Sequence, residues 1–356
     1  MAGITRTLKN LALSLSLARS VCCFAQQPGV EKAMQLVAAG NLDQAASMLL
    51  ELEKADPADF EVQYRLGLLL LKQGRLKEAR GHVESAAKLN PKSPVVRAAL
   101  ALVHEYLGKA AAARKDAPAA AKEFQEAIRI DPTRPVYYLD LAQLLLDHDT
   151  AEPAELVLQN AAQRFPKNVE VLRLLGLAEY AQGKSQEALE ALLKAIDADP
   201  DAESTYASLE ALLPDAQQRL PEVVAKLRSF SSRHAGSPIG HYLLALISPE
   251  ESEALARRAI QAAPNFWPAY FELYKILKAH ERWNEAVVAL EMAIQLNPGY
   301  APPHYALAEY YNRIGDRDRA AKERRLHHSL LAAQHKAEEL HRALAPPLAY
   351  AVEPAH

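Results

Sequence analysis

The sequence predicts an all-α protein, a solenoid of about nine antiparallel helix-turn-helix repeats. Half of its 356 residues are apolar but only 6% are aromatic, and an Ala- and Leu-rich chain favours helix over sheet. Prolines recur along the chain, and four of the seven spacings between them are 34 residues. A fixed period of this length indicates stacked supersecondary units. The recurring prolines are Pro57, Pro91, Pro132, Pro166, Pro200, Pro238, Pro264 and Pro298.

The first 25 residues have the pattern of a secretory signal peptide. Arg6 and Lys9 precede an apolar stretch at residues 11–18, and Cys23 and Ala25 are small residues at the two positions that a signal peptidase reads. We expect cleavage after Ala25, which removes both cysteines of the chain, and therefore export to the periplasm or the exterior. The alternatives are a cytoplasmic protein with a frayed N-terminus and a mitochondrial presequence.

Each part of the 34-residue period has a physical reason. Leu-small pairs such as Leu66-Gly67 place a large side chain beside a gap, so a second helix can approach closely. A glycine midway ends the first helix, and the proline stops the second. Short connections make the two helices antiparallel. The midway glycines are Gly40, Gly74, Gly108, Gly183 and Gly315.

Two stretches depart from the period. Seven extra residues lie between Pro91 and Pro132, around residues 108–117, and they predict one extra turn on each helix of that pair. Residues 203–266 are irregular, because Pro214 interrupts a first helix and the following unit is short. There Ser248-Pro249-Glu250-Glu251 predicts a capping box that opens a second helix.

The C-terminal segment predicts a long polar helix over about 318–343, whose end at 327–345 covers the open end of the solenoid. Residues 346–356 contain three prolines and are expected to be a disordered tail.

These motifs resemble the tetratricopeptide repeat (TPR) family over residues 26–326. Residues 60–93, 169–202 and 267–300 match the family pattern best, the last through Tyr270 and Trp283. The resemblance implies a right-handed superhelical solenoid whose first helices form a concave, ligand-binding groove. Some members clamp a partner's C-terminal carboxylates with Lys and Asn, but Tyr64 and Leu68 stand at corresponding inner positions here.

No catalytic, cofactor-binding or metal-binding residues are predicted. Lys plus Arg is 41 and Asp plus Glu is 44, which gives no sign of a nucleic-acid binder. Gly183-Lys184-Ser185 lacks the first glycine of a phosphate-binding loop, since Ala178 stands there. His328 and His335 are too far apart along a helix to share one ion. No apolar run reaches the length of a transmembrane helix.

A spacing of four and then three residues along each first helix selects the stripe that faces the groove. This stripe predicts a partner-binding surface with apolar and tyrosine anchors in its first half and more charge in its second. The residues are Tyr64, Leu68, Leu71, Leu102, Tyr106, Leu139, Gln143, Arg173, Leu177, Tyr180, Phe271, Lys275, Lys278 and Tyr305.

The sequence therefore predicts a non-catalytic scaffold or adaptor that binds peptide segments or partner proteins, in an exported multiprotein complex. The alternative is a carrier or chaperone for apolar chains or lipids. An enzyme would need an inserted catalytic domain, and none is visible in the sequence. A homo-oligomer that uses exposed apolar surface is a further possibility.

Overall fold

The computed structural model describes residues 28–344 and residue 348. The predicted signal peptide at 1–25 lies outside the described residues, and so does the predicted tail at 346–356 apart from Leu348. The chain divides into two compact units, and the boundary between Leu141 and Ala142 falls inside one helix. Each unit is described by itself.

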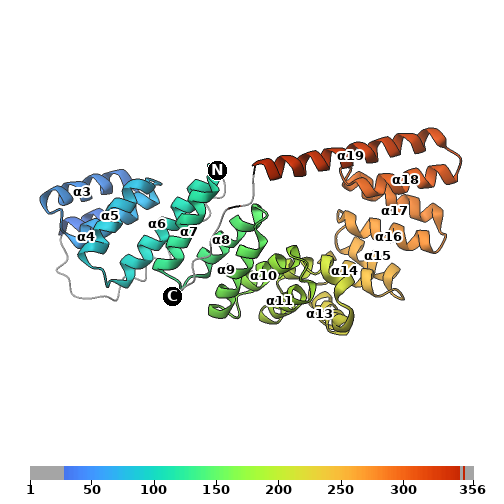
Figure 1. Cartoon of the computed structure of the whole chain (residues 1–356), viewed down its shortest axis with the longest axis horizontal. Helices are drawn as coiled ribbons and strands as arrows, with labels where there is room; N and C mark the ends of the chain where they lie inside the picture. Colours follow the sequence, from blue (N-terminus) through green and yellow to red (C-terminus); the bar gives the residue numbers. More distant parts are fainter. Residues whose placement is uncertain (1–27, 345–347, 349–356) are drawn as a thin grey trace. The chain divides into compact units, whose positions relative to one another are not determined.

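The first unit consists of antiparallel helix pairs, shown in blue to green in Figure 1. Its helices are α2 (Pro28–Ala38), α3 (Leu42–Ala55), α4 (Phe60–Lys72), α5 (Leu76–Leu89), α6 (Pro94–Ala113), α7 (Ala117–Ile130) and the first half of α8 (Pro135–Asp147).

The second unit continues the same alternation of first and second helices. It holds the rest of α8 and then α9 (Ala151–Arg164), α10 (Val169–Ala181), α11 (Ser185–Ala198), α12 (Glu203–Ala207), α13 (Leu220–Arg233), α14 (Pro238–Ile247), α15 (Ser252–Ala262), α16 (Trp267–Ala279), α17 (Trp283–Leu296), α18 (Ala301–Arg313) and α19 (Arg317–Leu344). Residues 28–344 thus form nine helix pairs and contain no strand, so the all-α repeat prediction is confirmed. No helix among the described residues combines the length and apolar character needed to cross a membrane.

The Leu-small pairs let the two helices of a pair pack closely, as predicted. A Cβ atom on Gly67 of α4 would lie 2.5 Å from Val83 Cγ2 on α5. A Cβ on Gly176 of α10 would lie 3.0 Å from the carbonyl oxygen of Ala188 on α11. Leu66 and Val83 are fully buried, and this packing builds the core inside each pair.

The midway glycines form left-handed turns at Gly40, Gly74, Gly183 and Gly315, each with a φ between 75° and 83°. The prediction for Gly108 was wrong. Gly108 lies inside α6, where an added Cβ would meet Phe124 Cε1 at 2.6 Å, so it is a helix-packing residue. Lys115 takes the left-handed position of that turn, with φ of 61°.

The seven extra residues all enter the first helix of the third pair. α6 has 20 residues against 13 in α4, whereas α7 has 14, the same as α5. The prediction of one extra turn on each helix was therefore wrong. Seven residues make about two turns of one helix, so the apolar face of α6 stays in phase along its whole length.

Residues 203–266 are irregular, as predicted. α12 has only five residues and is followed by a 3₁₀ helix at Glu210–Asp215 that contains Pro214. The predicted capping box was wrong: Ser248 is the C-cap residue that follows α14, and α15 begins at Ser252 without a side-chain cap. The Ser252 hydroxyl instead donates to the carbonyl oxygen of Pro249 at 2.9 Å.

Candidate peptide-binding surfaces

The first helices of successive pairs lie closer together than the second helices do. In the first unit α4 contacts both α2 and α6, and in the second unit α14 contacts both α12 and α16. Successive second helices make at most marginal contact within the described residues. Neighbouring elements are closest on the inner side of a curve, so the first helices line the inner face of each unit.

Apart from Leu71, the predicted residues of the first unit form an apolar surface on α4, α6 and α8. Tyr64 is half-buried, and its ring lies parallel to that of Phe60 with centroids 6.2 Å apart. Leu68, Leu102 and Tyr106 are partly buried against the core of this unit. Burial raises the pKa of the Tyr64 and Tyr106 hydroxyls, so both stay neutral donors near neutral pH.

The prediction of which side chains face the groove holds for most, but not all, residues of the first unit. Leu139 is half-buried on α8, as an inner-face residue would be. Leu71 is only 2% exposed and belongs to the core, so its side chain is not available to a partner. Leu71 follows two other buried leucines, Leu69 and Leu70, and at such a run the spacing rule cannot tell which side chain faces the groove.

In the second unit, α8 and α10 carry a mixed polar and aromatic surface. Gln143 is exposed and donates to Asp147 Oδ1 at 2.7 Å. Arg173 donates two hydrogen bonds to Glu170, of 2.9 Å and 2.5 Å, and this pairing lowers the pKa of the Glu170 carboxyl. Leu177 is half-buried and Tyr180 is 40% exposed. Arg173 is thus held in place by Glu170 on the same helix that bears the exposed Tyr180.

An aromatic group lies where α16 meets α18. The Tyr300 ring is 4.6 Å from that of Trp267 and 5.9 Å from that of Phe271, measured between centroids. Tyr305 of α18 is 49% exposed, and its ring centroid lies 5.4 Å from that of His327 on α19. The tilted and edge-on packing of these rings orients each of them and leaves Tyr305 accessible.

The two predicted lysines of α16 already have partners. Lys278 donates to Glu309 Oε2 at 3.0 Å, which raises the pKa of the lysine. Lys275 is paired with Glu272, and its Nζ lies 5.6 Å from the centre of the Phe271 ring. An acidic ligand would therefore compete with Glu309 and Glu272 for these cations.

One polar cluster of the first unit was missed in the sequence. Lys109 of α6 lies 2.5 Å from Glu105 Oε1 and 3.1 Å from Asp140 Oδ2 of α8. Burial raises the pKa of Asp140 to about 6. The hydroxyl of Tyr137, also on α8, is buried without a hydrogen-bond partner. The spacing of four residues between Glu105 and Lys109 was a visible signal for the helical half of this cluster.

A family model described as tetratricopeptide repeat matches residues 30–94, 97–135 and 139–203. The chain contains TPR repeats over these ranges. The family matches that the sequence predicted at 60–93 and 169–202 lie inside these ranges, and the one predicted at 267–300 lies beyond them.

One curated relative of this chain is small glutamine-rich tetratricopeptide repeat-containing protein 2 of Saccharomyces cerevisiae. The two are 35% identical over 94 residues, which is 26% of this chain and 27% of the relative. The match thus spans about a quarter of the relative's length.

Two solved structures are also similar. Yeast Tom70 is 15% identical, with 89% of this chain and 88% of that chain covered and a TM-score of 0.48. The C-terminal part of a TPR repeat-containing protein from Cytophaga hutchinsonii is 15% identical, with 77% and 97% covered and a TM-score of 0.48.

Proposed function

We propose that this protein is a non-catalytic scaffold that binds peptide segments of partner proteins along its first helices, within an exported multiprotein complex. The observation that carries the proposal is the exposure of tyrosines at inner positions. Tyr180 and Tyr305 are 40% and 49% exposed, although a large ring gains most by being covered. Tyrosine is enriched at the centres of protein interfaces because its ring is apolar and its tip is polar.

The chemistry of the two units favours different parts of a ligand. In the first unit, Leu68, Leu102 and Tyr106 would accept apolar side chains. In the second unit Lys278 and Lys275 would orient an acidic stretch, at the expense of their present partners. Because those ion pairs are half-exposed, exchanging one carboxylate for another changes the binding free energy little, and the charges contribute mainly to orientation.

The test begins with the full chain, tagged at its C-terminus and expressed in its native host. Cross-linked partners are identified by mass spectrometry, and the contact segment of one partner is made as a peptide. The variant Tyr64→Ala with Tyr180→Ala is expected to bind this peptide at least about 10-fold more weakly in calorimetry, with unchanged helix content.

The matched control removes two exposed apolar side chains from second helices. Leu156 of α9 is 46% exposed and Val288 of α17 is 60% exposed. Leu156→Ala with Val288→Ala should bind like the wild type. Equal binding by the tyrosine variant would refute the inner-face assignment, and broad capture of unrelated apolar chains or lipids would favour the carrier function.

Export is tested in the same material. We expect an N-terminus at Gln26 in the protein recovered outside the cytoplasm. An intact Met1 in the cytosol would refute export without touching the proposal of peptide binding.

A further inference from the structure

The second half of α19 extends beyond the helix on which its first half packs. α19 has 28 residues, twice the length of a second helix such as α17, which has 14. Its first turns pack on α18, where Ala320 is buried and Glu323 pairs with His304 at 2.8 Å. Within α19, the side chains described after Leu331 are all exposed. The added length corresponds to about 21 Å of helix.

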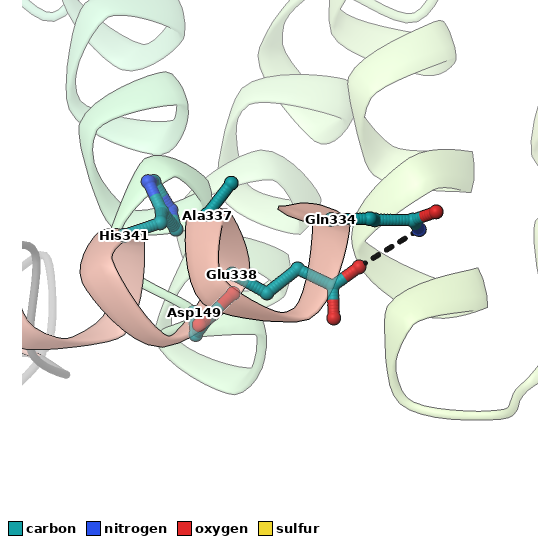
Figure 2. A pocket seen from close by; sticks show the side chains of 5 residues that line it. All are labelled: Asp149, Gln334, Ala337, Glu338 and His341. Carbon is teal, nitrogen blue, oxygen red and sulfur yellow. Dashed lines mark hydrogen bonds between the residues drawn. The ribbon is translucent and has the colours of Figure 1, made fainter. Parts of the chain in front are cut away.

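This half of α19 reaches the other end of the second unit. Figure 2 shows Asp149, in the turn between α8 and α9, beside α19. Asp149 lines one hollow of about 450 Å³ together with Gln334, Ala337, Glu338 and His341 of α19. The turn lies near the start of the second unit and α19 near its end, so the two ends of this unit are neighbours.

A backbone hydrogen bond at the same place supports this closure independently. The N–H of Leu348 donates to Oγ1 of Thr150 at 3.1 Å, across 198 residues of sequence. Thr150 follows Asp149 directly and is buried, and Leu348 is partly buried. One contact from α19 and one from a residue just beyond it therefore join the C-terminal end of the second unit to its first turn.

The contact between α19 and the turn is loose. The side chains that line the hollow are all exposed, so the helix and the turn do not pack tightly against each other there. Two of these side chains, Asp149 and Glu338, are carboxylates, and their like charges repel across the hollow. Such a contact can form and break at small cost in free energy.

The second unit also contains a place where its curvature can change. α12, the first helix of its pair, has 5 residues against 13 in α10. It is followed by 3₁₀ helices at Glu210–Asp215 and Gln217–Arg219, and Gln217 has a φ of 21°. The hydrogen bonds of 3₁₀ turns have poorer geometry than those of α-helices, and such turns often mark hinges. Bending therefore costs least at residues 203–219, between the two ends that α19 brings together.

We propose that the second unit opens and closes, with α19 as its clasp and residues 203–219 as its hinge. The clasp consists of residues 334–341 of α19 and Leu348 on one side, and of Asp149 and Thr150 on the other. In the closed state, which is the one described here, the clasp joins the two ends of the unit. In the open state α19 leaves the turn between α8 and α9, and the unit bends at the hinge.

Closure also acts on the function proposed above. Tyr180 of α10 and Tyr305 of α18 lie on first helices between the two ends that the clasp joins. A peptide segment bound along these helices would be enclosed in the closed state and released in the open state. This consequence rests on the proposed function, whereas closure itself is tested without a ligand, so either one can fail without the other.

The first test measures closure in the full chain, with Cys22 and Cys23 replaced by Ala. A short bismaleimide should join Asp149→Cys to Ala337→Cys within one molecule, and mass spectrometry of the digested monomer identifies the link. The matched control is Glu281→Cys with Ala337→Cys. Glu281 has the same place in a later turn, with φ of 60° against 51° at Asp149, and it is nearer to Ala337 in the sequence.

A docked α19 predicts that the Asp149 pair is linked at least about 10-fold faster than the Glu281 pair, because a contact raises the effective concentration of its two sides. Random collisions in a flexible chain would instead favour the control pair, which closes the shorter loop. Equal or slower linking of the Asp149 pair would overturn the clasp.

The second test measures opening through charge. Nitroxide labels at Leu156→Cys on α9 and Leu340→Cys on α19, both exposed positions, report the distance across the clasp by electron spin resonance. This parent should give a short and a long distance. Glu338→Lys replaces repulsion of Asp149 by attraction and should raise the ratio of closed to open molecules about 2- to 5-fold. The control Glu339→Lys makes the same charge change outside the lining of the hollow and should leave the ratio unchanged.

Three results would contradict the proposal. A single long distance in the labelled parent would overturn closure, and a single short one would overturn opening. Equal effects of the two lysine variants would overturn docking at the turn that bears Asp149. The hinge is checked with labels at Gln261→Cys and Val288→Cys, which both follow residues 203–219 and are exposed. This pair should give one distance, and two distances would place the hinge elsewhere.

Discussion

The hydroxyl of Tyr206 donates a hydrogen bond of 3.0 Å to the carbonyl oxygen of Pro200, six residues earlier. The proline stops one helix, and the tyrosine lies on the first helix of the next pair. The link therefore holds the connecting turn against the helix that follows it. The same six-residue relationship joins Gln63 to Pro57, Tyr138 to Pro132, Tyr270 to Pro264 and His304 to Pro298.

Removing one such link should lower stability modestly. Tyr206 is 1% exposed, and Arg233 also donates to the Pro200 carbonyl at 2.8 Å, so the acceptor keeps one partner. We expect Tyr206→Phe to lower the free energy of unfolding by about 1 kcal/mol in urea titration. Tyr180→Phe, at a 40% exposed position, serves as control and should change it by less than about 0.5 kcal/mol. Equal effects of both changes would show that the link contributes nothing.

The close contact at Gly67 predicts opposite effects at two glycines of one helix pair. Gly67→Ala forces Val83 to move, because the new Cβ would lie 2.5 Å from Val83 Cγ2, and should destabilise by about 1–3 kcal/mol. Gly81 has no atom within 4 Å of an added Cβ and lies inside α5, so Gly81→Ala should stabilise by about 0.5–1 kcal/mol. Thermal and urea unfolding measure both, and a stable Gly67→Ala would contradict the packing described here.

The turn after α16 places a glutamate where other repeats have glycine. Glu281 has φ of 60°, close to the 75° of Gly183 in the turn after α10. A side chain at such an angle costs on the order of 1 kcal/mol. We expect Glu281→Gly to raise the free energy of unfolding by about 0.5–1 kcal/mol and Gly183→Ala to lower it by about 1 kcal/mol. Urea titrations of the two variants should therefore move the midpoint in opposite directions.

Glu179 makes stability depend on pH. Its carboxyl is 7% exposed on α10, and burial together with nearby Glu155 raises its pKa to about 7. A carboxyl whose pKa is raised by folding stabilises the folded state fully below its ordinary pKa of 4.5. This contribution is lost as pH rises through about 7.

We therefore expect Glu179→Gln to match the wild type near pH 4.5 and to exceed its stability at pH 8 by on the order of 1–3 kcal/mol. Lys184 and Glu187, from the turn and α11, also act on this carboxyl and are left unchanged. Glu291→Gln, on the exposed surface of α17, is the control and should follow the wild-type pH profile. A pH profile of Glu179→Gln parallel to that of the wild type would contradict the raised pKa.

The repeat architecture was readable because it depends on residues with few alternatives. Proline stops helices, glycine takes positive φ, and Leu-Gly pairs allow close packing. The sequence alone therefore predicted a helix stop at Pro57, a turn at Gly74 and a helix contact at Leu66. Gly108 misled because glycine serves two purposes, a turn and a close helix contact, and only the position of Phe124 decides between them. Likewise, the seven-residue insertion predicted the added helical length, but it did not show whether α6 or α7 would be longer.

The candidate surface was predicted less completely. Helical spacing placed Tyr180 and Tyr305 on an exposed face, since angular position follows from the period alone. It could not show that Lys278 is paired with Glu309, because that contact joins residues 31 apart on different helices. The buried neighbourhood of Asp140 likewise comes from α6, another helix, and has no local signature at Asp140 itself.

At the short α12, the match to the family model ends but the stack of helix pairs does not. The ranges that the family model matches end at residue 203, where α12 begins, yet the helix pairs continue to residue 344. Beyond that point Tyr206, Leu209 and Leu212 are each at most 2% exposed, although most of the helix has become 3₁₀ turns. Continuity of the core from one repeat to the next therefore depends on apolar side chains that fill these buried positions. The stack of repeats therefore continues where the helix is lost, because those core positions stay occupied.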